Sequence, residues 1–432
     1  MQSLLENWRA LEQGNWALPV AYLLVAAIAL QVLLMLYGTA RRQLAEREQM
    51  RLSTRRLGLE VETAMLRYRE AEQTKFVWNG YRKFRVAQKT LECKGVFSFH
   101  LTPHDGKPLP PFKPGQFLTF QLKVPGQAKP VVRCYSLSDG PNHLDHYRVT
   151  IKKELPPPDK PNVPPGVASS FFCDSVEPGE ILDVKAPGGN FYLDLTKDTG
   201  MVLISAGVGV TPMLSMLNAV VANKSQREVW FFFGVRNKSE HIQKEYLERV
   251  AAEHDNVHLH VSYSKPTPED RLRVDYQHAG RVSVELFKQL LPSNNYEYFL
   301  CGPGAFMKSI TDGLSEWGVP SQSVFFEAFG PATIKKAAPP VAASAAAQAV
   351  EVNFSRSGKV CQWKPESGSL LDLAEANGIK IECGCRTGNC GTCLVAIKSG
   401  KIDYMAGHGA ASEDGSCLTC ICKPQSDLVL DA

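Results

Sequence analysis

The stretch Cys385-Arg-Thr-Gly-Asn-Cys390-Gly-Thr-Cys393, followed downstream by Cys420, is the feature around which this sequence is organised. Three cysteines with the spacing C-x4-C-x2-C, and a fourth further along the chain, are typical of the loop that holds a [2Fe–2S] cluster. Glycines beside and between these cysteines allow the tight backbone turns that converging thiolates require. We therefore predict that Cys385, Cys390, Cys393 and Cys420 are the metal ligands.

The fourth ligand requires a choice, because two other cysteines flank Cys420. The segment from Leu418 to Pro424 resembles the end of plant-type ferredoxins, in which Leu-Thr-Cys is followed four residues later by proline, and this resemblance selects Cys420. A zinc site made of Cys390, Cys393, Cys417 and Cys420 is an alternative, but it leaves Cys385 and the glycines without a role. We interpret Cys383 and Cys422 as neighbouring or buried thiols.

Length and composition limit the possible functions. A chain of 432 residues is long enough for two or three domains, and its 44% hydrophobic and 21% charged content is ordinary for globular protein. The net charge of +4 gives no support to a nucleic-acid partner. Seven of the 12 cysteines lie between residues 383 and 422, which favours metal binding in a reducing compartment over disulfides.

Residues 1–40 are predicted to form an N-terminal transmembrane anchor. The apolar run from Trp16 to Tyr37 is interrupted by Gln31 and is long enough to cross a hydrocarbon core of about 30 Å. No basic region precedes the run, which argues against a signal peptide, whereas several arginines follow it. The positive-inside rule then predicts a single-pass membrane protein, compatible with a bacterial inner membrane, whose catalytic domains are cytoplasmic. A buried hydrophobic helix is the alternative.

Residues 41–75 are predicted to form a charged helical stalk. From residue 41 to residue 89 there are 13 lysines and arginines against 6 glutamates. Such an excess of positive charge favours contact with anionic headgroups of the lipid bilayer. A solvated helix or a short coiled coil explains the same pattern equally well.

Residues 76–196 are predicted to form an antiparallel β-barrel. Short runs with strand periodicity, at 116–122, 146–152 and 180–186, are separated by clusters of proline and glycine. The proline-rich insert at 155–163 has no assigned function.

The segment Arg133-Cys-Tyr135-Ser136 resembles the flavin motif Arg-x-Tyr-Ser of the ferredoxin–NADP reductase superfamily. The resemblance implies that the barrel binds FAD, with Arg133 on a phosphate, Tyr135 against the isoalloxazine and Ser136 on a ring nitrogen. Gly166 and Ser169 belong to a segment that resembles the flavin-pyrophosphate site of these proteins. The strand that lies along the flavin would carry three further binding residues, Arg148, Thr150 and Lys152.

Residues 197–332 are predicted to form an α/β nucleotide-binding domain. The apolar run 201–206 is typical of a buried parallel strand, and it leads into Gly207-Val-Gly209-Val-Thr211-Pro212 and a helical pattern. Glycines let the backbone approach a pyrophosphate, and the start of a helix favours its negative charge. The motif resembles the nicotinamide half of the same superfamily, which implies that Gly207, Gly209, Thr211 and Pro212 bind NADH or NADPH.

Two further segments of this domain resemble the superfamily. Cys301-Gly302-Pro303 resembles its Cys-Gly-Pro loop, in which the cysteine lies beside the nicotinamide, although a small buried residue at a strand end is an alternative for Cys301. Glu327 and Phe329 lie in a segment that resembles the end of the reductase module of flavohaemoproteins, where such residues approach flavin and nicotinamide. The side chain of Arg236 is able to bind an adenosine 2′-phosphate, which favours NADPH. The preference between NADH and NADPH stays open.

Residues 333–349 are of low complexity and are predicted to form a linker that holds the last domain at high effective concentration while it moves. Residues 350–432 resume strand periodicity and include the cysteine loop. The resemblance to plant-type ferredoxins implies an α+β ferredoxin-like β-grasp domain.

The order of modules, flavin then nicotinamide then ferredoxin, resembles the phthalate dioxygenase reductase family. This resemblance implies that NAD(P)H gives a hydride to FAD at a site made by Tyr135, Ser136, Thr211, Cys301 and Glu327, and that single electrons leave through the cluster. We expect the acceptor to be a protein at or near the membrane, such as an oxygenase, a desaturase or a respiratory protein. Direct reduction of a quinone and a role as a redox sensor are the alternatives.

Overall fold

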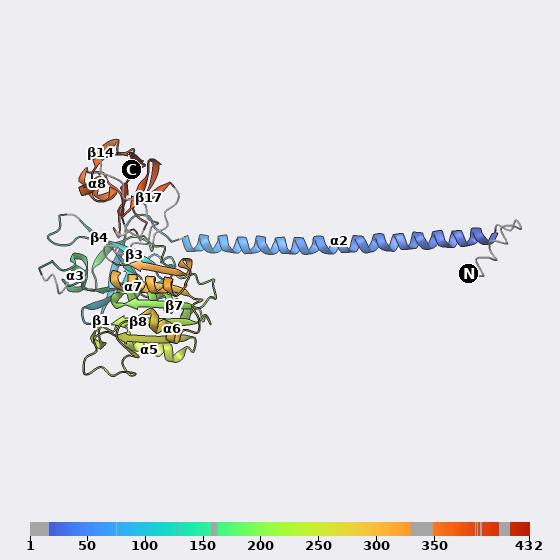
Figure 1. The fold of residues 1–432 in the computed structure, drawn as a ribbon. Helices are drawn as coiled ribbons and strands as arrows, with labels where there is room; N and C mark the ends of the chain where they lie inside the picture. The colour runs from blue at the N-terminus through green and yellow to red at the C-terminus, as the bar shows by residue number, and fades with distance from the viewer. Residues whose placement is uncertain are drawn as a thin grey trace. The chain divides into compact units, whose positions relative to one another are not determined.

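The computed structural model describes residues 17–74, 76–128, 130–156, 162–329, 349–384, 386, 388, 391–405 and 415–432. The chain divides into two units, Met1–Thr74 and Lys75–Ala432. The first unit contains one continuous helix of 58 residues, α2 (Ala17–Thr74), which covers most of the predicted anchor and stalk (Figure 1). The side chains from Val20 to Tyr37 are all exposed, and the segment Pro19–Gly58 reaches a mean hydropathy of 2.4. This helix therefore has the length and composition that a membrane span requires.

The second unit begins with an antiparallel sheet whose strand order is β4-β3-β6-β1-β2-β5. An additional bridge between Leu137 and Val149 joins the end of β4 to β5, so that the two outer strands meet and the sheet closes into a barrel. Alternate side chains fill its interior, which explains the period-two hydrophobic pattern of the sequence. The strands are β1 (Arg82–Cys93), β2 (Val96–Pro103), β3 (Phe117–Leu122), β4 (Val131–Ser136), β5 (Tyr147–Lys152) and β6 (Ile181–Val184), and the helix α3 (Val167–Asp174) lies between β5 and β6.

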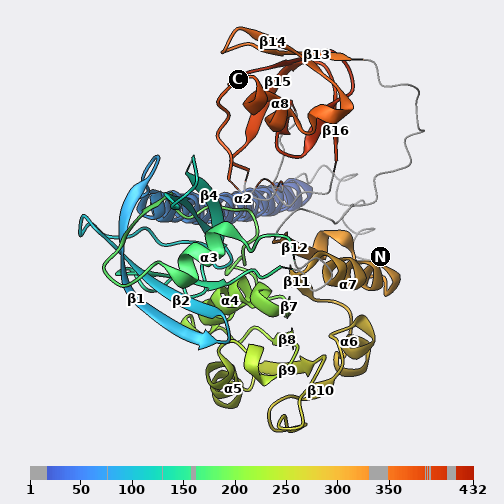
Figure 2. The same ribbon diagram turned by 90° about the vertical axis from the view of Figure 1, so that its left-hand side faces the viewer.

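A parallel six-stranded sheet follows, with the order β10-β9-β8-β7-β11-β12. Its strands are β7 (Met201–Ala206), β8 (Val229–Val235), β9 (Val257–Tyr263), β10 (His278–Ala279), β11 (Glu297–Gly302) and β12 (Val324–Ala328). Helices α4 (Val210–Ala222) and α5 (Lys244–Glu253) cover one face, and α6 (Val284–Leu290) and α7 (Gly304–Glu316) cover the other (Figure 2). Strands buried on both faces are nearly all apolar, as β7 is apart from Ser205.

The carboxyl ends of β7 and β11 mark the point where the strand order of this sheet reverses. In open α/β sheets, ligands bind in the crevice at such a point. The turn Gly207–Gly209 after β7 packs directly on β11, because a Cβ atom at Gly209 would lie 2.3 Å from the carbonyl oxygen of Cys301. Glycine is therefore required at this position by close backbone contact.

The C-terminal domain contains a five-stranded sheet with the order β14-β13-β19-β15-β17, in which β13 and β19 are parallel. Its elements are β13 (Val350–Phe354), β14 (Lys359–Trp363), α8 (Leu370–Ala376), β15 (Leu394–Ser399), β16 (Ile402–Tyr404), β17 (Ser416–Leu418), β18 (Cys422–Pro424) and β19 (Leu428–Leu430). A mixed sheet with one short helix agrees with the predicted α+β β-grasp class. The predicted linker lies almost entirely outside the described residues.

A buried ion pair secures the sheet at the end opposite the crevice. Arg227 is 4% exposed, and one of its guanidinium nitrogens lies 2.5 Å from a carboxylate oxygen of Glu297, at the start of β11. Lys197 approaches the other oxygen of the same carboxylate at 2.6 Å, but the lysine side chain is 47% exposed. The two cations thus share one carboxylate, but Arg227 is buried and also donates to the carbonyl oxygens of Thr199 and Asp194.

We expect Arg227→Ala to lower the free energy of unfolding of the α/β domain by about 3–5 kcal/mol, because it leaves a buried carboxylate without its buried partner. The matched variant Lys197→Ala should cost less than about 1 kcal/mol, since its ion pair is solvated. Hydrogen exchange of the β7 and β11 amides measures the opening of this domain separately from the others. Equal losses in the two variants would contradict this account.

Candidate functional site

The end of the barrel strand β4 meets the end of β12 at a buried hydrogen bond. The hydroxyl of Ser136 donates to Glu327 Oε2 over 3.2 Å, and both residues are at most 5% exposed. Glu327 is the register partner of Cys301 on the adjacent strand β11, so these two side chains lie next to each other. The fold thereby brings together Ser136, Cys301 and Glu327, which were predicted from separate motifs and span 191 positions of the chain.

Cys301 is fully buried at the carboxyl end of β11. Burial, followed by the charge of Glu327, raises the pKa of its thiol well above the usual value, so the sulfur is protonated at neutral pH. Gly209 contacts the backbone of this cysteine, and Thr211 is buried in the first turn of α4, where its hydroxyl donates to the carbonyl of Val208. The nicotinamide-type motif and the Cys-Gly-Pro loop therefore adjoin. Gly302 ends β11 and Pro303 is the N-cap of α7.

Tyr135 stands beside Ser136 on β4 and is held by two phenylalanines. Its ring makes edge contacts with Phe120 and Phe172, at centroid distances of 5.8 and 5.2 Å. Burial raises the pKa of its phenol, so the ring stays neutral and presents an apolar surface. Arg133, two residues earlier, is exposed, and its guanidinium donates to the carbonyl of Val132. Phe329 follows β12 and is 38% exposed.

Strand β5 carries three predicted binding residues in different situations. The hydroxyl of Thr150 is 2.7 Å from that of Ser98 and 2.8 Å from that of Ser138, so it is used inside the barrel. Arg148 donates to the carbonyl oxygen of Ser138 at 2.6 Å, which fixes the guanidinium at the β4–β5 turn. Ser138 thus organises both residues, yet it carried no signal in the sequence beyond its place after the Arg-x-Tyr-Ser motif.

The segment predicted to bind the flavin pyrophosphate leads into α3. Ser169 is 7% exposed, and its hydroxyl donates to the carbonyl of Gly166 and accepts from the amide of Glu154, both at 3.1 Å. The next hydroxyl, that of Ser170, is buried and has no hydrogen-bond partner among the described residues. A polar group left over in the first turn of a helix suits an anionic ligand. Sequence reasoning missed Ser170.

A cavity of about 460 Å³ opens at the carboxyl edge of the parallel sheet. Its polar wall contains three cations, Lys152, Arg236 and Arg281, and one carboxylate, Glu240. Glu240 lies 3.2 Å from Lys152 and 3.4 Å from Arg236, whose side chain is 65% exposed. The excess of positive charge and the adjoining turn at Gly207 fit a dinucleotide with phosphate groups. The motifs did not point to Arg281, nor to Phe306 in the apolar wall.

The C-terminal cysteines separate into two groups. Cys393 and Cys420 belong to one small hydrophobic cluster, and their sulfur atoms are 3.2 Å apart. Thiolates that share a tetrahedral metal at about 2.3 Å lie about 3.8 Å apart, so a small outward movement would bring both onto one ion. Cys385 and Cys390 lie outside the described residues.

Cys417 and Cys422 belong instead to the main core of this domain, and both are fully buried. A hydrogen bond to Cys417, together with burial, raises the pKa of the Cys422 thiol, which favours a neutral thiol at Cys422. Cys417, which the alternative zinc site needs, thus lies in a different cluster from Cys393 and Cys420.

Three domain families match the chain. The oxidoreductase FAD-binding domain matches residues 83–192, the oxidoreductase NAD-binding domain matches residues 203–312, and the 2Fe-2S iron-sulfur cluster binding domain matches residues 352–425. The matched ranges fall on the barrel, the parallel α/β domain and the C-terminal domain respectively.

Known proteins resemble the chain over two or three of these domains. A flavohemoprotein from Halalkalibacterium halodurans is 37% identical over 63% of this chain, and the chain covers 65% of its length. The flavohem-like FAD/NAD-binding domain of nitric oxide dioxygenase from Vibrio cholerae is 28% identical, with a TM-score of 0.52 over 59% of this chain and 100% of that one. Phthalate dioxygenase reductase is 25% identical, with a TM-score of 0.52, and the match covers 82% of this chain and 98% of that one.

The barrel that binds FAD, the α/β domain that binds NAD(P)H and the C-terminal [2Fe–2S] domain follow one another as sequence reasoning expected from the ferredoxin–NADP reductase superfamily. The chain therefore carries an oxidoreductase FAD-binding domain, an oxidoreductase NAD-binding domain and a [2Fe–2S] domain, the three modules that an NAD(P)H-dependent electron-transfer reductase combines.

Proposed function

We propose that this reductase supplies single electrons to a protein acceptor at a membrane, and that Ser136, Glu327 and Cys301 form the place where nicotinamide and flavin meet. The observation that carries the proposal is the buried Ser136–Glu327 hydrogen bond, which connects the flavin-type strand of the barrel to the strand beside Cys301. When bound, FAD accepts an electron pair from the nucleotide and releases electrons singly, which suits the one-electron cluster. The contribution of the protein is to position the nucleotide and the flavin next to each other.

In this proposal each side chain has a distinct role. Tyr135 presents a neutral ring, held by its two phenylalanine contacts, as a surface for the isoalloxazine. Ser136 holds its hydroxyl at the edge of that ring, oriented by the carboxylate of Glu327. Cys301, neutral and buried, would lie beside the nicotinamide without adding charge. Close packing of Gly209 on Cys301 keeps the two halves of the site in register.

The nucleotide is proposed to lie along the cavity at the carboxyl edge of the sheet. Arg236 and Arg281 would bind its phosphates, and the exposed position of Arg236 suits a 2′-phosphate and hence NADPH. Glu240 already occupies one side of Arg236, and a carboxylate at this edge also suits the hydroxyls of an unphosphorylated ribose. Both nucleotides are therefore compatible with this cavity.

An oxygenase-type acceptor is supported by the likeness to phthalate dioxygenase reductase, whose name describes reduction of such a partner. A membrane location is supported by α2, because its apolar side chains are exposed along a stretch long enough to cross a bilayer. The arginines that follow the apolar stretch favour a cytoplasmic position for the catalytic domains. Attachment to a membrane raises the rate of encounter with an acceptor in the same membrane.

We expect Ser136→Ala to retain FAD but to slow reduction of the flavin by NAD(P)H about 10- to 100-fold, because one positioned donor at the ring edge is lost. Glu327→Gln, which keeps an acceptor for the serine hydroxyl, should be less impaired than Glu327→Ala. Stopped-flow bleaching of the flavin band measures this step. A Ser136→Ala protein that is reduced at the normal rate would refute the assigned role.

The cluster ligands are tested by four variants. Cys393→Ser and Cys420→Ser should lose most of the bound iron, whereas Cys417→Ala and Cys422→Ala should retain it, because the second pair lies in the core. All four should still reduce ferricyanide with NAD(P)H, since that reaction needs the flavin alone. Iron content and electron paramagnetic resonance of the reduced protein provide the measurement, and loss of iron in Cys417→Ala but not in Cys420→Ser would reverse the assignment.

Removal of residues 1–40 tests the membrane role. The truncated protein should reduce dyes with NAD(P)H at an unchanged rate, but it should appear in the soluble fraction and reduce membrane-bound acceptors much more slowly. Native membranes with the gene deleted serve as the source of acceptor. If the truncated protein restores membrane reduction as well as the full chain does, the anchor has no part in delivery.

A further inference from the structure

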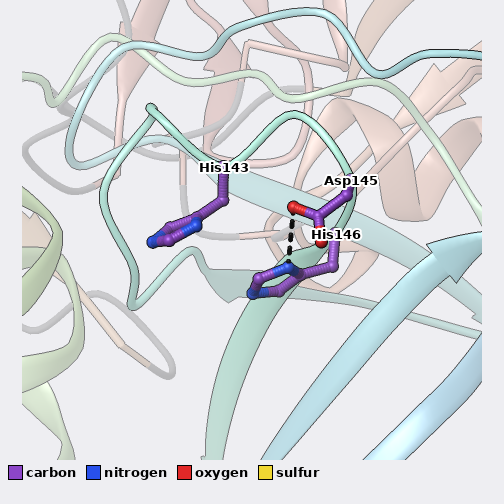
Figure 3. Close-up of side chains that lie close together, drawn as sticks. All are labelled: His143, Asp145 and His146. Carbon is purple, nitrogen blue, oxygen red and sulfur yellow. Dashed lines mark hydrogen bonds and ion pairs between the residues drawn. The ribbon is translucent and has the colours of Figure 1, made fainter.

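A cluster of metal-ligating side chains lies outside the sites described above, on the turn between β4 and β5. His143, Asp145 and His146 each place one possible ligand atom within 4.8 Å of the others (Figure 3). His143 and Asp145 are exposed, and His146 is partly buried against the barrel. The proposed redox function uses none of the three, and no cysteine takes part.

The spacing of these atoms suits a metal ion. Asp145 Oδ1 and His146 Nδ1 are 3.1 Å apart. Two ligands bound at about 2.05 Å to a tetrahedral Zn²⁺ lie about 3.3 Å apart, so this pair already spans one edge of such a site. His143 faces the same space from the preceding part of the turn (Figure 3). Small movements of an exposed side chain would complete a set of three ligands, with water in a fourth position.

A second carboxylate stands behind His146. The Nε2 atom of its ring lies 3.8 Å from Asp139 Oδ2, on the side opposite to Asp145. Histidines that bind metals usually present the other ring nitrogen to a carboxylate, which fixes the tautomer and orients the ring. Asp139 is itself held in place, because it accepts a hydrogen bond from Asn218 of α4 over 3.1 Å. The hydrogen bond between His146 Nδ1 and Asp145 Oδ1 holds the ring in place, with the Asp139 carboxylate near its other nitrogen.

We propose that the β4–β5 turn binds one divalent transition-metal ion through His143, Asp145 and His146, with Asp139 as the orienting carboxylate. Imidazole ligands select Zn²⁺, Ni²⁺ or Cu²⁺ over Mg²⁺ and Ca²⁺, which prefer oxygen alone. Binding through Nδ1 requires the His146 tautomer whose proton is on Nε2, the nitrogen that faces Asp139. Through Asp139 and Asn218, the bound ion also braces the turn that joins the two flavin strands against the nucleotide domain.

Equilibrium dialysis of the full-length protein, loaded with flavin and iron, against buffered Zn²⁺ tests the proposal. We expect one Zn²⁺ per chain in addition to the iron, and an affinity at least about tenfold weaker in His143→Ala and in His146→Ala. Asp139→Asn should weaken binding about tenfold while keeping the one-to-one ratio. Because His143 is exposed, His143→Ala should keep its full flavin and iron content, which shows that the fold is intact.

His104→Ala is the matched control, because His104 is also followed by an aspartate, but Asp105 is paired with Arg82. This variant should bind Zn²⁺ as tightly as the natural chain. Cu²⁺ bound to the oxidised protein, whose flavin and cluster are silent in electron paramagnetic resonance, should show couplings from two imidazole nitrogens. Equal Zn²⁺ affinity in His143→Ala, His146→Ala and the natural chain, or displacement of iron by the added Zn²⁺, would overturn the proposal.

Discussion

The hydrogen bond from Ser136 to Glu327 is the contact on which the geometry of the proposed redox site depends. It joins two domains with different architectures, a closed antiparallel barrel and a parallel α/β sheet, at the carboxyl ends of β4 and β12. Both groups are buried, so each is shielded from water and is satisfied by polar partners within the protein. The residues that are proposed to orient the cofactors therefore also form one of the contacts across the domain boundary.

The parallel sheet explains why Glu327 lies next to Cys301. Parallel strands present their carboxyl ends at one edge, so residues far apart in the chain become neighbours there. The register that pairs Cys301 with Glu327 depends on the packing of β12 beside β11, which in turn depends on α7 and the apolar residues on that face. Each chemical group belongs to a local sequence motif, whereas the register of the sheet determines how far apart the groups lie.

Much of this arrangement was predictable from the sequence, for physical reasons that differ between regions. Strand periodicity indicated the barrel, and a nearly all-apolar run before Gly207 indicated a buried parallel strand. The cysteine spacing indicated the iron–sulfur domain. What the sequence could not indicate was contact between distant segments: the Ser136–Glu327 bond, the pairing of Cys417 with Cys422, and the cavity position of Arg281. The hydroxyls of Ser138 and Ser170 also went unnoticed, because an isolated serine has no pattern that distinguishes a structural role from an exposed one.

Two different domains contribute residues to the wall of the cavity, which couples nucleotide binding to the contact between these domains. Lys152 extends from the barrel, whereas Arg236 and Glu240 belong to the α/β domain, and the carboxylate joins the two cations. A dinucleotide bound to Arg236 in this cavity would also lie beside Lys152, so its binding would add cohesion between the barrel and the α/β domain. By thermodynamic reciprocity, anything that tightens that boundary, including an occupied flavin site, also tightens the grip on the nucleotide. On the proposed function, nucleotide binding and the cohesion of the two domains would therefore be thermodynamically coupled.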